Sequence, residues 1–422
     1  MVAEPRYLSG DSDFLFGQDQ LHTFEIDVPQ DALARIDASP AAEEYVEATL
    51  AFAGENVGAI GVRYKGSVGG FVGCTDSPNP LVPTGEKTCT KLSMQLKINW
   101  TDPDAQFYGV RKVQLHSQNL DPTMMHERLG YWLFAAMGVP VPRSTHARVM
   151  VNGEYQGLFA LTEEIDGRFA RYHFDDGTGN LYKEVWPFDV AGLPNDPDLL
   201  IASLHTNEDE NPTTAIISEF ATDLVGADDG AELDTLTRWL DVEMLLTTFV
   251  VDRAIRNDDG PLHWYCFGPC APHNFYWYED PSARQVTLIP WDLDNAFDNL
   301  GTGSFTGAVT NIADPWAEIT SDCDPFPFGM LNLLQRSAAC DPLIGALSSL
   351  DAEYDRIRAE LIAGPMSEDS VQALIAEWSA QVEAAVEEAA ALHADAPSVA
   401  EWRAAMAKLV SDINATRAGA GR

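Results

Sequence analysis

The order of hydrophobic patterns along the chain constrains its fold more than any other feature. Apolar residues alternate or run together over strand lengths in the first third of the sequence, at 24–28, 58–66 and 91–100. From about residue 166 onward they recur at helical spacing instead, over 234–256 and much of 348–418. Strands in one stretch and helices in another are typical of an α+β protein.

This change of pattern predicts two lobes. Residues 1–165 form a β-rich N-lobe with one long helix, and residues 166–422 form a mainly helical C-lobe. The N-lobe helix is predicted over 122–137, because Asp121 suits a helix cap and Gly138 suits a helix end. The fold class expected from the sequence is therefore α+β with two lobes.

Two β-hairpins are also expected. Alternating runs flank Asn152 and Gly153, a dipeptide whose positive φ angles suit a tight hairpin turn. A second pair of strands, rich in aromatic and β-branched residues, is predicted within 273–280 and 284–297. The second hairpin interrupts the helical part of the chain and ends in clustered acids, so it is the expected place for chemistry.

The charge of the chain limits its partners. Sixty-five acidic residues against 26 basic ones give a net charge of −39, and this field repels nucleic acid and anionic membranes. No apolar run approaches the roughly 20 residues that cross a bilayer, so neither nucleic acid nor a membrane span is expected. An anionic nucleotide would need divalent cations or a local basic cluster to approach this protein.

Six cysteines form three neighbouring pairs, Cys74 with Cys89, Cys266 with Cys270, and Cys323 with Cys340. Six cysteines allow 15 connectivities, and short loops lose least entropy on closure, so neighbour pairing is favoured. Disulfides imply an oxidising compartment, which predicts a secreted or cell-surface protein. The first residues lack the basic and apolar segments of a signal peptide. The alternative is reduced thiols or a zinc site.

A metal site is predicted where an apolar strand ends in acids. Asp292, Asp294 and Asp298 follow the run VTLIP. Carboxylates in this position either turn into solvent or bring hard oxygen ligands to a cation such as Mg²⁺ or Mn²⁺. Both interpretations remain open from composition alone.

A second acidic string ends the apolar helix that precedes it. Asp258 and Asp259 lie in the string RNDDG, at 256–260, which could face the first acidic cluster within catalytic loops at 257–298. One of these carboxylates could position a hydroxyl nucleophile. The alternative is a turn or capping role, which such tracts commonly have.

Phosphoryl transfer needs divalent ions that bridge phosphates, a lysine that neutralises charge, and an aspartate that aligns the incoming hydroxyl. Lys65, Lys91 and Lys97 lie on or beside predicted strands, and Lys183 follows the strand-like GNLYK. The alternative is that these lysines are solvated charges at sheet edges. All the residue types that the reaction requires are therefore present.

Several strings together resemble the CotH kinase family, the spore-coat protein H group of atypical kinases, over roughly residues 15–300. The strings that carry the resemblance are GVRYKG, KLSMQLK, DPTMMHERLGYWLFAAMGVPVPR, VNGEYQGLFALTEEID, GNLYK, Asn257 to Asp259, HNFYWY and PWDLD. The resemblance implies a divergent, bilobal protein-kinase-like fold.

The resemblance also implies roles in catalysis. Asp292 would bind magnesium, with Asn274 or Asp294 as its companion. Asp259 would be the catalytic aspartate, with Asp258 as its rival.

On the nucleotide side, the resemblance implies that Lys91 and Lys97 face the phosphates of ATP. Glu163 and Tyr182 are candidates for the adenine side, and Lys183 is a further ATP-binding candidate.

The sequence departs from the family pattern at three places. His126 replaces an arginine that many relatives carry, and Val286 replaces an aromatic residue. The stretch between Asn257 and Asn274 is longer than in relatives and contains the pair Cys266 and Cys270. This insertion is expected to act as a lid, to select the substrate, or to decorate an edge.

Three functions are compatible with these residues. The first is an ATP- and Mg²⁺- or Mn²⁺-dependent kinase that phosphorylates Ser or Thr of secreted or surface proteins. The second is another ATP-dependent transferase on the same fold, such as one that transfers AMP. The third is a non-catalytic surface module that binds structural Ca²⁺, for which Asp102 and Asp104 offer oxygen ligands.

Overall fold

The computed structural model describes residues 11–79, 82–208, 212–257, 259–297, 316–328 and 332–418. The chain divides into two compact units, each made of several segments. The first unit contains Met1–Arg128, Pro142–Glu164 and Ala373–Met406, and the second contains Leu129–Val141, Ile165–Gln372 and Ala407–Arg422. Helices and strands occur in both units, so the α+β class is confirmed.

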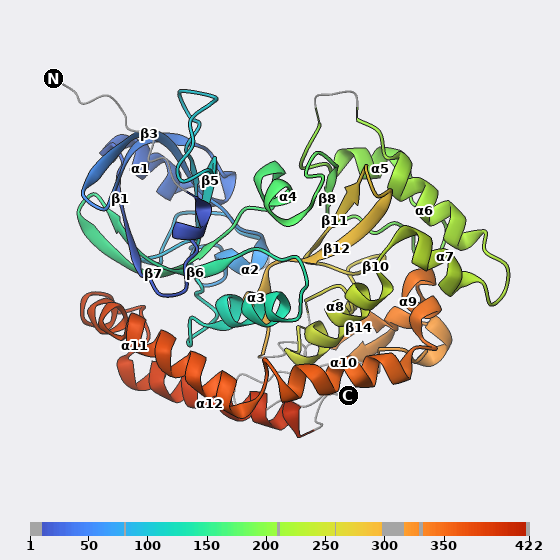
Figure 1. Ribbon diagram of the computed structural model, residues 1–422. Helices are drawn as coiled ribbons and strands as arrows, with labels where there is room; N and C mark the ends of the chain where they lie inside the picture. Colours follow the sequence, from blue (N-terminus) through green and yellow to red (C-terminus); the bar gives the residue numbers. More distant parts are fainter. Residues whose placement is uncertain are drawn as a thin grey trace. The chain divides into compact units, whose positions relative to one another are not determined.

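The first unit is built on a closed barrel of seven strands, which Figure 1 shows mainly in blue and cyan. In spatial order the strands are β1 (His22–Asp27), β2 (Val46–Phe52), β3 (Glu55–Tyr64), β4 (Met94–Lys97), β5 (Lys112–His116), β7 (Glu154–Thr162) and β6 (Ser144–Val151). The barrel closes by parallel pairing of β1 with β6, and its other pairs are antiparallel. Closure satisfies the backbone of both edge strands. Phe24, Leu50, Leu96, Leu115 and Phe159 fill the interior and are fully buried.

The turn between β6 and β7 agrees with its prediction. Asn152 has a φ of 52° and Gly153 a φ of 79°, the left-handed pair that a tight hairpin requires. The first unit also contains the short helices α1 (Gln30–Ala38) and α2 (Val68–Phe71).

Two boundaries in this region differ from the prediction. Helix α3 spans His126–Ala136 rather than 122–137, because the Asp121 carboxylate accepts the backbone N–H of both Thr123 and His126 and holds a turn ahead of the helix. Gly138, with a φ of 83°, lies just beyond the helix as expected.

The predicted strand at 91–100 is reduced to β4, Met94–Lys97. The carbonyl oxygen of Lys91 accepts a hydrogen bond from the Asn119 side chain instead of a strand neighbour. Lys91 therefore lies in the loop before the strand, beside it rather than on it.

Part of the chain's end belongs to the first unit. Helix α11 (Glu368–Leu392) contributes Gln381, whose amide oxygen accepts a hydrogen bond from Arg128 at 2.8 Å. Helix α12 (Val399–Arg417) contributes Trp402, whose indole N–H donates to the Thr123 carbonyl at 3.1 Å. Arg128 also lies over the ring of Trp378. The helical prediction for 348–418 is confirmed.

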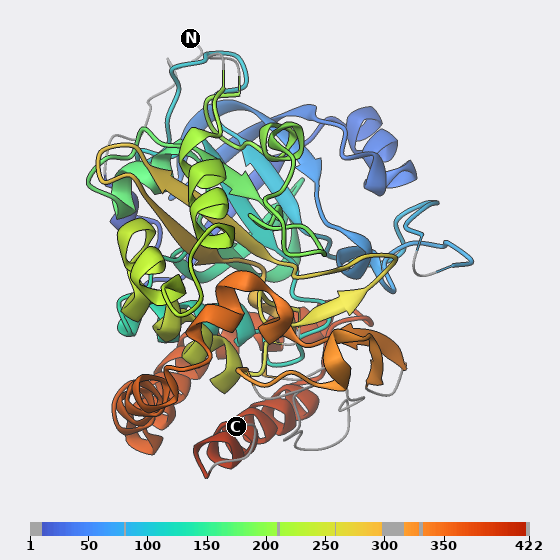
Figure 2. The same ribbon diagram turned by 90° about the vertical axis from the view of Figure 1, so that its right-hand side faces the viewer.

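The second unit contains a three-stranded sheet in the order β12-β11-β8. Its strands are β8 (Leu181–Lys183), β11 (Phe275–Asp280) and β12 (Gln285–Pro290), and the predicted hairpin of β11 and β12 is confirmed. Helices α6 (Ala215–Val225) and α7 (Glu232–Trp239), in green, contact β12, which is coloured gold (Figure 2). The remaining helices of this unit are α4 (Gly167–His173), α5 (Pro197–Ala202), α8 (Val242–Ala254), α9 (Pro342–Leu347) and α10 (Asp351–Ala363).

The single helix predicted over 234–256 is instead two helices, α7 and α8. Asp241 separates them, because its side chain accepts the backbone N–H of Met244 and begins a new helix. Every residue from Leu245 to Ala254 is buried, so α8 forms a central helix of this unit.

The three predicted disulfides, Cys74–Cys89, Cys266–Cys270 and Cys323–Cys340, are confirmed. The second one closes the hairpin of β9 (Trp264–Cys266) and β10 (Cys270–Ala271). This hairpin joins β13 (Phe326–Phe328) and β14 (Leu333–Arg336) in a sheet of order β10-β9-β14-β13. Among the described residues, no helix combines the length and apolar character needed to cross a bilayer.

Candidate active site

Three segments of the second unit bring polar side chains together. Asp259 follows α8, Asn274 directly precedes β11, and Asp292 follows β12. Phe275 pairs with Pro290 in the hairpin, and the backbone N–H of Trp291 donates to the Asn274 carbonyl at 3.0 Å. The hairpin therefore places Asn274 and Asp292 at the same end of the sheet.

The Asp259 carboxylate is held by a hydrogen bond to each oxygen. The Asn274 amide donates to Oδ2 at 2.7 Å, and the Tyr265 hydroxyl donates to Oδ1 at 2.7 Å. The backbone N–H of Asn274 donates in turn to Glu184 Oε1 at 3.3 Å. The orientation of Asp259 is thus fixed by side chains from two segments, strand β9 and the residue before β11.

The environment of Asp259 disfavours its charged form. Burial is the main cause that raises its pKa to about 6, and the negative charges of Asp292 and Glu184 act in the same direction. The hydrogen bonds from Tyr265 and Asn274 oppose this rise. Carboxylates gathered in this way favour a bound cation, which would relieve their mutual repulsion.

Three residues of this cluster have a left-handed backbone conformation. Glu184, Asn274 and Asp292 have φ angles of 53°, 55° and 55°, in the left-handed region that residues with a Cβ seldom adopt. Such residues persist where the surrounding structure holds them, and they are common at active sites.

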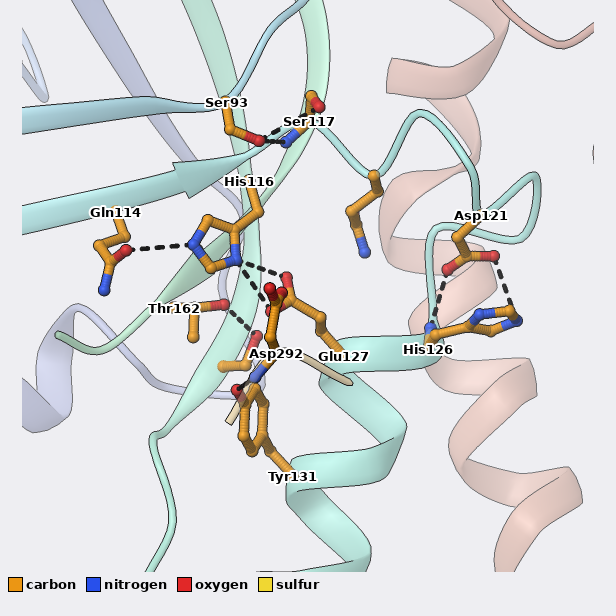
Figure 3. Close-up of polar contacts among 12 residues, drawn as sticks. Ser93, Gln114, His116, Ser117, Asp121, His126, Glu127, Tyr131, Thr162 and Asp292 are labelled. Carbon is orange, nitrogen blue, oxygen red and sulfur yellow. Dashed lines mark hydrogen bonds and ion pairs between the residues drawn. The ribbon is translucent and has the colours of Figure 1, made fainter. Parts of the chain in front are cut away.

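Two further contacts hold these loops. The backbone N–H of Asp292 donates to the Tyr131 hydroxyl of α3 at 3.0 Å (Figure 3). Asn257 donates from Nδ2 to Asp252 Oδ1 at 2.9 Å, and a Cβ at Gly260 would lie 2.4 Å from both of those atoms. Gly260 is therefore required for close packing behind Asp259.

The acidic strings contain three further predicted residues, Asp294, Asp258 and Asp298. Asp294 is half-buried on a 3₁₀ turn, Leu293–Asn295, beyond Asp292. Asp258 and Asp298 lie outside the described residues. Within the described ranges, no three His, Cys, Asp or Glu side chains gather in a group that could hold a metal by themselves. An amide oxygen such as that of Asn274 would have to contribute.

Sequence reasoning missed two residues of this cluster, Glu184 and Tyr265. Glu184 follows Lys183 at the end of β8, and its contact with Asn274 joins residues 90 positions apart. Tyr265 lies in the insertion before Cys266, where the disulfide loop was the visible signal. The insertion supplies a residue to the site rather than only decorating an edge.

The remaining predicted residues of the second unit are Tyr182 and Lys183. Tyr182 is fully buried, and burial is the main cause that raises its pKa. Its ring therefore packs inside the unit, and the adenine-side role assigned to it remains a prediction. Lys183 ends β8, pairs in register with Tyr276 and is half-buried.

In the first unit, Glu163 is engaged by a bidentate ion pair. Arg143 Nη2 lies 2.6 Å from Glu163 Oε1, and Arg143 Nε lies 3.0 Å from Oε2. The nearest polar group to this carboxylate is thus a guanidinium of the same unit. Lys97 places its ammonium over the rings of Tyr45 and Trp100, so its stem covers apolar surface.

Polar contacts in the first unit join Lys65 to His116 and His116 to Glu127, and the last two residues were not predicted for the site. The Lys65 ammonium contacts Gln114 Oε1 and lies 3.0 Å from His116 Nε2. Figure 3 shows that His116 also contacts Glu127, with His116 Nδ1 2.8 Å from both carboxylate oxygens. Glu127 is fully buried. The sequence pointed to Lys65 only as one of several strand lysines, and no local pattern joins it to His116 and Glu127.

His126, the departure from the family pattern in α3, has a clear structural partner. Its Nε2 lies 3.3 Å from Asp121 Oδ1, and both side chains are buried (Figure 3). The predicted calcium ligand Asp102 accepts the backbone N–H of Asp104 at 2.9 Å, which is an ordinary turn contact. The calcium site remains a prediction.

Lys91 lines a cavity of about 550 Å³ in the first unit, and its ammonium donates to the Leu158 carbonyl at 2.9 Å and lies over the Phe159 ring. Burial lowers the pKa of Lys91 from 10.5 to about 8. The folded state therefore carries a penalty that is complete below pH 8 and disappears as the pH rises toward 10.5.

Replacing Lys91 with Met should raise the free energy of unfolding at pH 7 by about 1–2 kcal/mol, a value reduced for partial exposure and for the lost bond to Leu158. At pH 9.5 this increase in the free energy of unfolding should be smaller. Urea unfolding of the full chain at both pH values measures it, with Lys97→Met as the control. A gain that is the same at both pH values would contradict the assignment.

Comparison with known proteins identifies the family of the chain. A family model described as "CotH kinase protein" matches residues 62–417, most of the chain. The inner spore coat protein H-like protein of Bacillus subtilis (strain 168) is 28% identical over 98 residues, which cover 23% of this chain and 30% of that protein. The inner spore coat protein H of the same organism is 29% identical over 72 residues, which cover 17% of this chain and 20% of that protein. The aligned regions thus span a third or less of these relatives, but the family match spans both units, and the chain belongs to the CotH kinase protein family.

Proposed function

We propose that this protein is an ATP- and divalent-metal-dependent phosphotransferase that acts on Ser or Thr of secreted or surface proteins. The observation that carries the proposal is the convergence of Asp259, Asn274 and Asp292 from three separate segments: Asn274 donates a hydrogen bond to Asp259, and the negative charge of Asp292 acts on Asp259. Membership of a family named for kinases supports it. We further propose that the two units correspond to the two lobes of a divergent kinase-like fold.

In this proposal Asp259 orients the hydroxyl of the acceptor. A carboxylate offers about four lone-pair sites, and Tyr265 and Asn274 occupy one on each oxygen. The remaining lone pairs are oriented by these two bonds and can accept the hydroxyl proton during transfer. The pKa of about 6 leaves Asp259 ionised at neutral pH.

The residues present fit a hard divalent cation. Asn274 directs its Nδ2 to Asp259, so its Oδ1 is on the other side of the amide, and Asp292 brings a carboxylate at the same end of the sheet. We propose Asp292 and Asn274 as the protein ligands, with Asp294 as a companion. Bound Mg²⁺ or Mn²⁺ would bridge phosphate oxygens of ATP and neutralise charge that develops during transfer.

For the nucleotide phosphates we propose lysines of the first unit. Lys91 and Lys97 follow from the family resemblance. Lys65 is the stronger candidate on contacts, because His116 links it to the buried carboxylate of Glu127, which fixes the position of its ammonium. The disulfides support a secreted or surface location for the protein and its acceptor.

The test is incubation of the full chain with Mg²⁺ and a panel of secreted proteins, once with γ-labelled and once with α-labelled ATP. Label should pass to Ser or Thr from γ-labelled ATP alone. Transfer from α-labelled ATP would instead identify AMP transfer. Stabilisation by Ca²⁺ without transfer of either label would identify a non-catalytic module.

A further inference from the structure

The disulfide hairpin β9–β10 carries a tyrosine into the candidate site. Tyr265 directly precedes Cys266, and the Cys266–Cys270 disulfide closes the hairpin behind it. The Tyr265 hydroxyl donates to Asp259 Oδ1 at 2.7 Å. Through this bond the β9–β10 hairpin, which is not part of the three-stranded sheet, contacts Asp259, the residue that we propose orients the acceptor hydroxyl.

The Tyr265 ring is held on several sides. It stacks on His273, with ring centroids 4.1 Å apart and planes inclined by 4°. In the sheet, Tyr265 pairs with Ala271 on β10 and with Gln335 on β14. Strand pairing holds the backbone of Tyr265 and stacking on His273 holds its ring, so the bond from its hydroxyl to Asp259 loses little side-chain entropy when it forms.

We infer that Tyr265 is a positioning residue that fixes the plane of the Asp259 carboxylate for transfer, an inference that rests on the proposed phosphotransferase function. Asn274 holds Oδ2 and Tyr265 holds Oδ1, so the carboxylate cannot rotate about its Cβ–Cγ bond without breaking one of these bonds. Without the tyrosine hydroxyl, only one oxygen remains anchored. The carboxylate then samples orientations in which its lone pairs miss the acceptor hydroxyl.

The test begins with Tyr265→Phe, which removes the hydroxyl and keeps the ring that stacks on His273. We expect kcat to fall on the order of ten- to a hundredfold, the usual scale for a lost hydrogen bond to a charged group, while the KM for ATP stays within about twofold. Tyr278→Phe is the matched control. It deletes a hydroxyl in the same unit that bonds to the backbone of Gly179 and Asp176, and it should leave kcat unchanged.

A double-mutant cycle with Asp259→Asn separates positioning from a general structural effect. If Tyr265 acts through the Asp259 carboxylate, adding Tyr265→Phe to Asp259→Asn should cause less than a twofold further loss. A full additional loss in the double variant, or a Tyr265→Phe variant with normal kcat, overturns the inference while the proposed function stands. A wild-type chain that neither transfers nor hydrolyses ATP overturns both.

Discussion

Replacing Asp292 with Asn should lower phosphoryl transfer by about a thousandfold or more, because it removes the carboxylate that we propose as the main metal ligand. Asn is the informative change, since the φ of Asp292 is 55° and Asn tolerates this left-handed conformation better than other residues with a Cβ. The hydrogen bond from its backbone to Tyr131 is independent of the side chain and should persist. Asp292→Ala should lose as much activity and, in addition, about 1 kcal/mol of stability.

Three measurements check this expectation: the transfer rate, the affinity for Mn²⁺ and ATP, and thermal unfolding. Both affinities should fall in Asp292→Asn, with little change in the unfolding temperature. Asp198→Asn, which neutralises an exposed carboxylate of the same unit, is the control for net charge and should behave like the wild type. An Asp292→Asn variant that transfers phosphate at the normal rate would place the metal elsewhere.

Replacing Asp259 with Asn should lower turnover by roughly a thousandfold while ATP affinity changes by less than about threefold. The variant loses the group that aligns the acceptor hydroxyl, an interaction made mainly in the transition state. It also places an amide opposite the Asn274 amide and the Tyr265 hydroxyl, so one of the two present bonds must rearrange. ATP should therefore still bind to Asp259→Asn, whereas the ATP affinity of Asp292→Asn should fall.

The comparison with Asp258→Asn decides between neighbouring carboxylates. Kinetics of both variants, with ATP affinity from equilibrium titration, should show a large loss of turnover in Asp259→Asn alone. If only Asp258→Asn stops transfer, the aligning residue is Asp258. If neither change slows transfer, a kinase mechanism based on this loop is wrong.

Elements with strong local signals could be predicted from the sequence. The Asn152–Gly153 turn follows from backbone preferences of two residues, and the β11–β12 hairpin follows from aromatic and β-branched runs. Boundaries that depend on one side chain were missed. Asp121 holds a turn before α3, and Asp241 begins α8 where the apolar pattern continues without a break.

Some residues of the candidate site could likewise be predicted from local sequence signals, and others could not. Asp259, Asn274 and Asp292 were predicted because each lies in a distinctive string, and the structure brings them together. Glu184 and Tyr265 could not be predicted, because their contacts depend on how distant loops meet. The link from Lys65 through His116 to Glu127 was missed for the same reason, since it joins two strands and a helix.

The composition of the first unit has a consequence for the order of events during synthesis. Strand β1 closes the barrel against β6, and the unit also includes Ala373–Met406, whose Gln381 and Trp402 bond to Arg128 and Thr123. Domains generally fold from the N-terminus as the ribosome releases them. The whole of this unit cannot do so, because Ala373–Met406 leaves the ribosome only after Ile165–Gln372 of the second unit. The barrel strands can pair among themselves before then, but Arg128 and Thr123 gain their partners Gln381 and Trp402 only later.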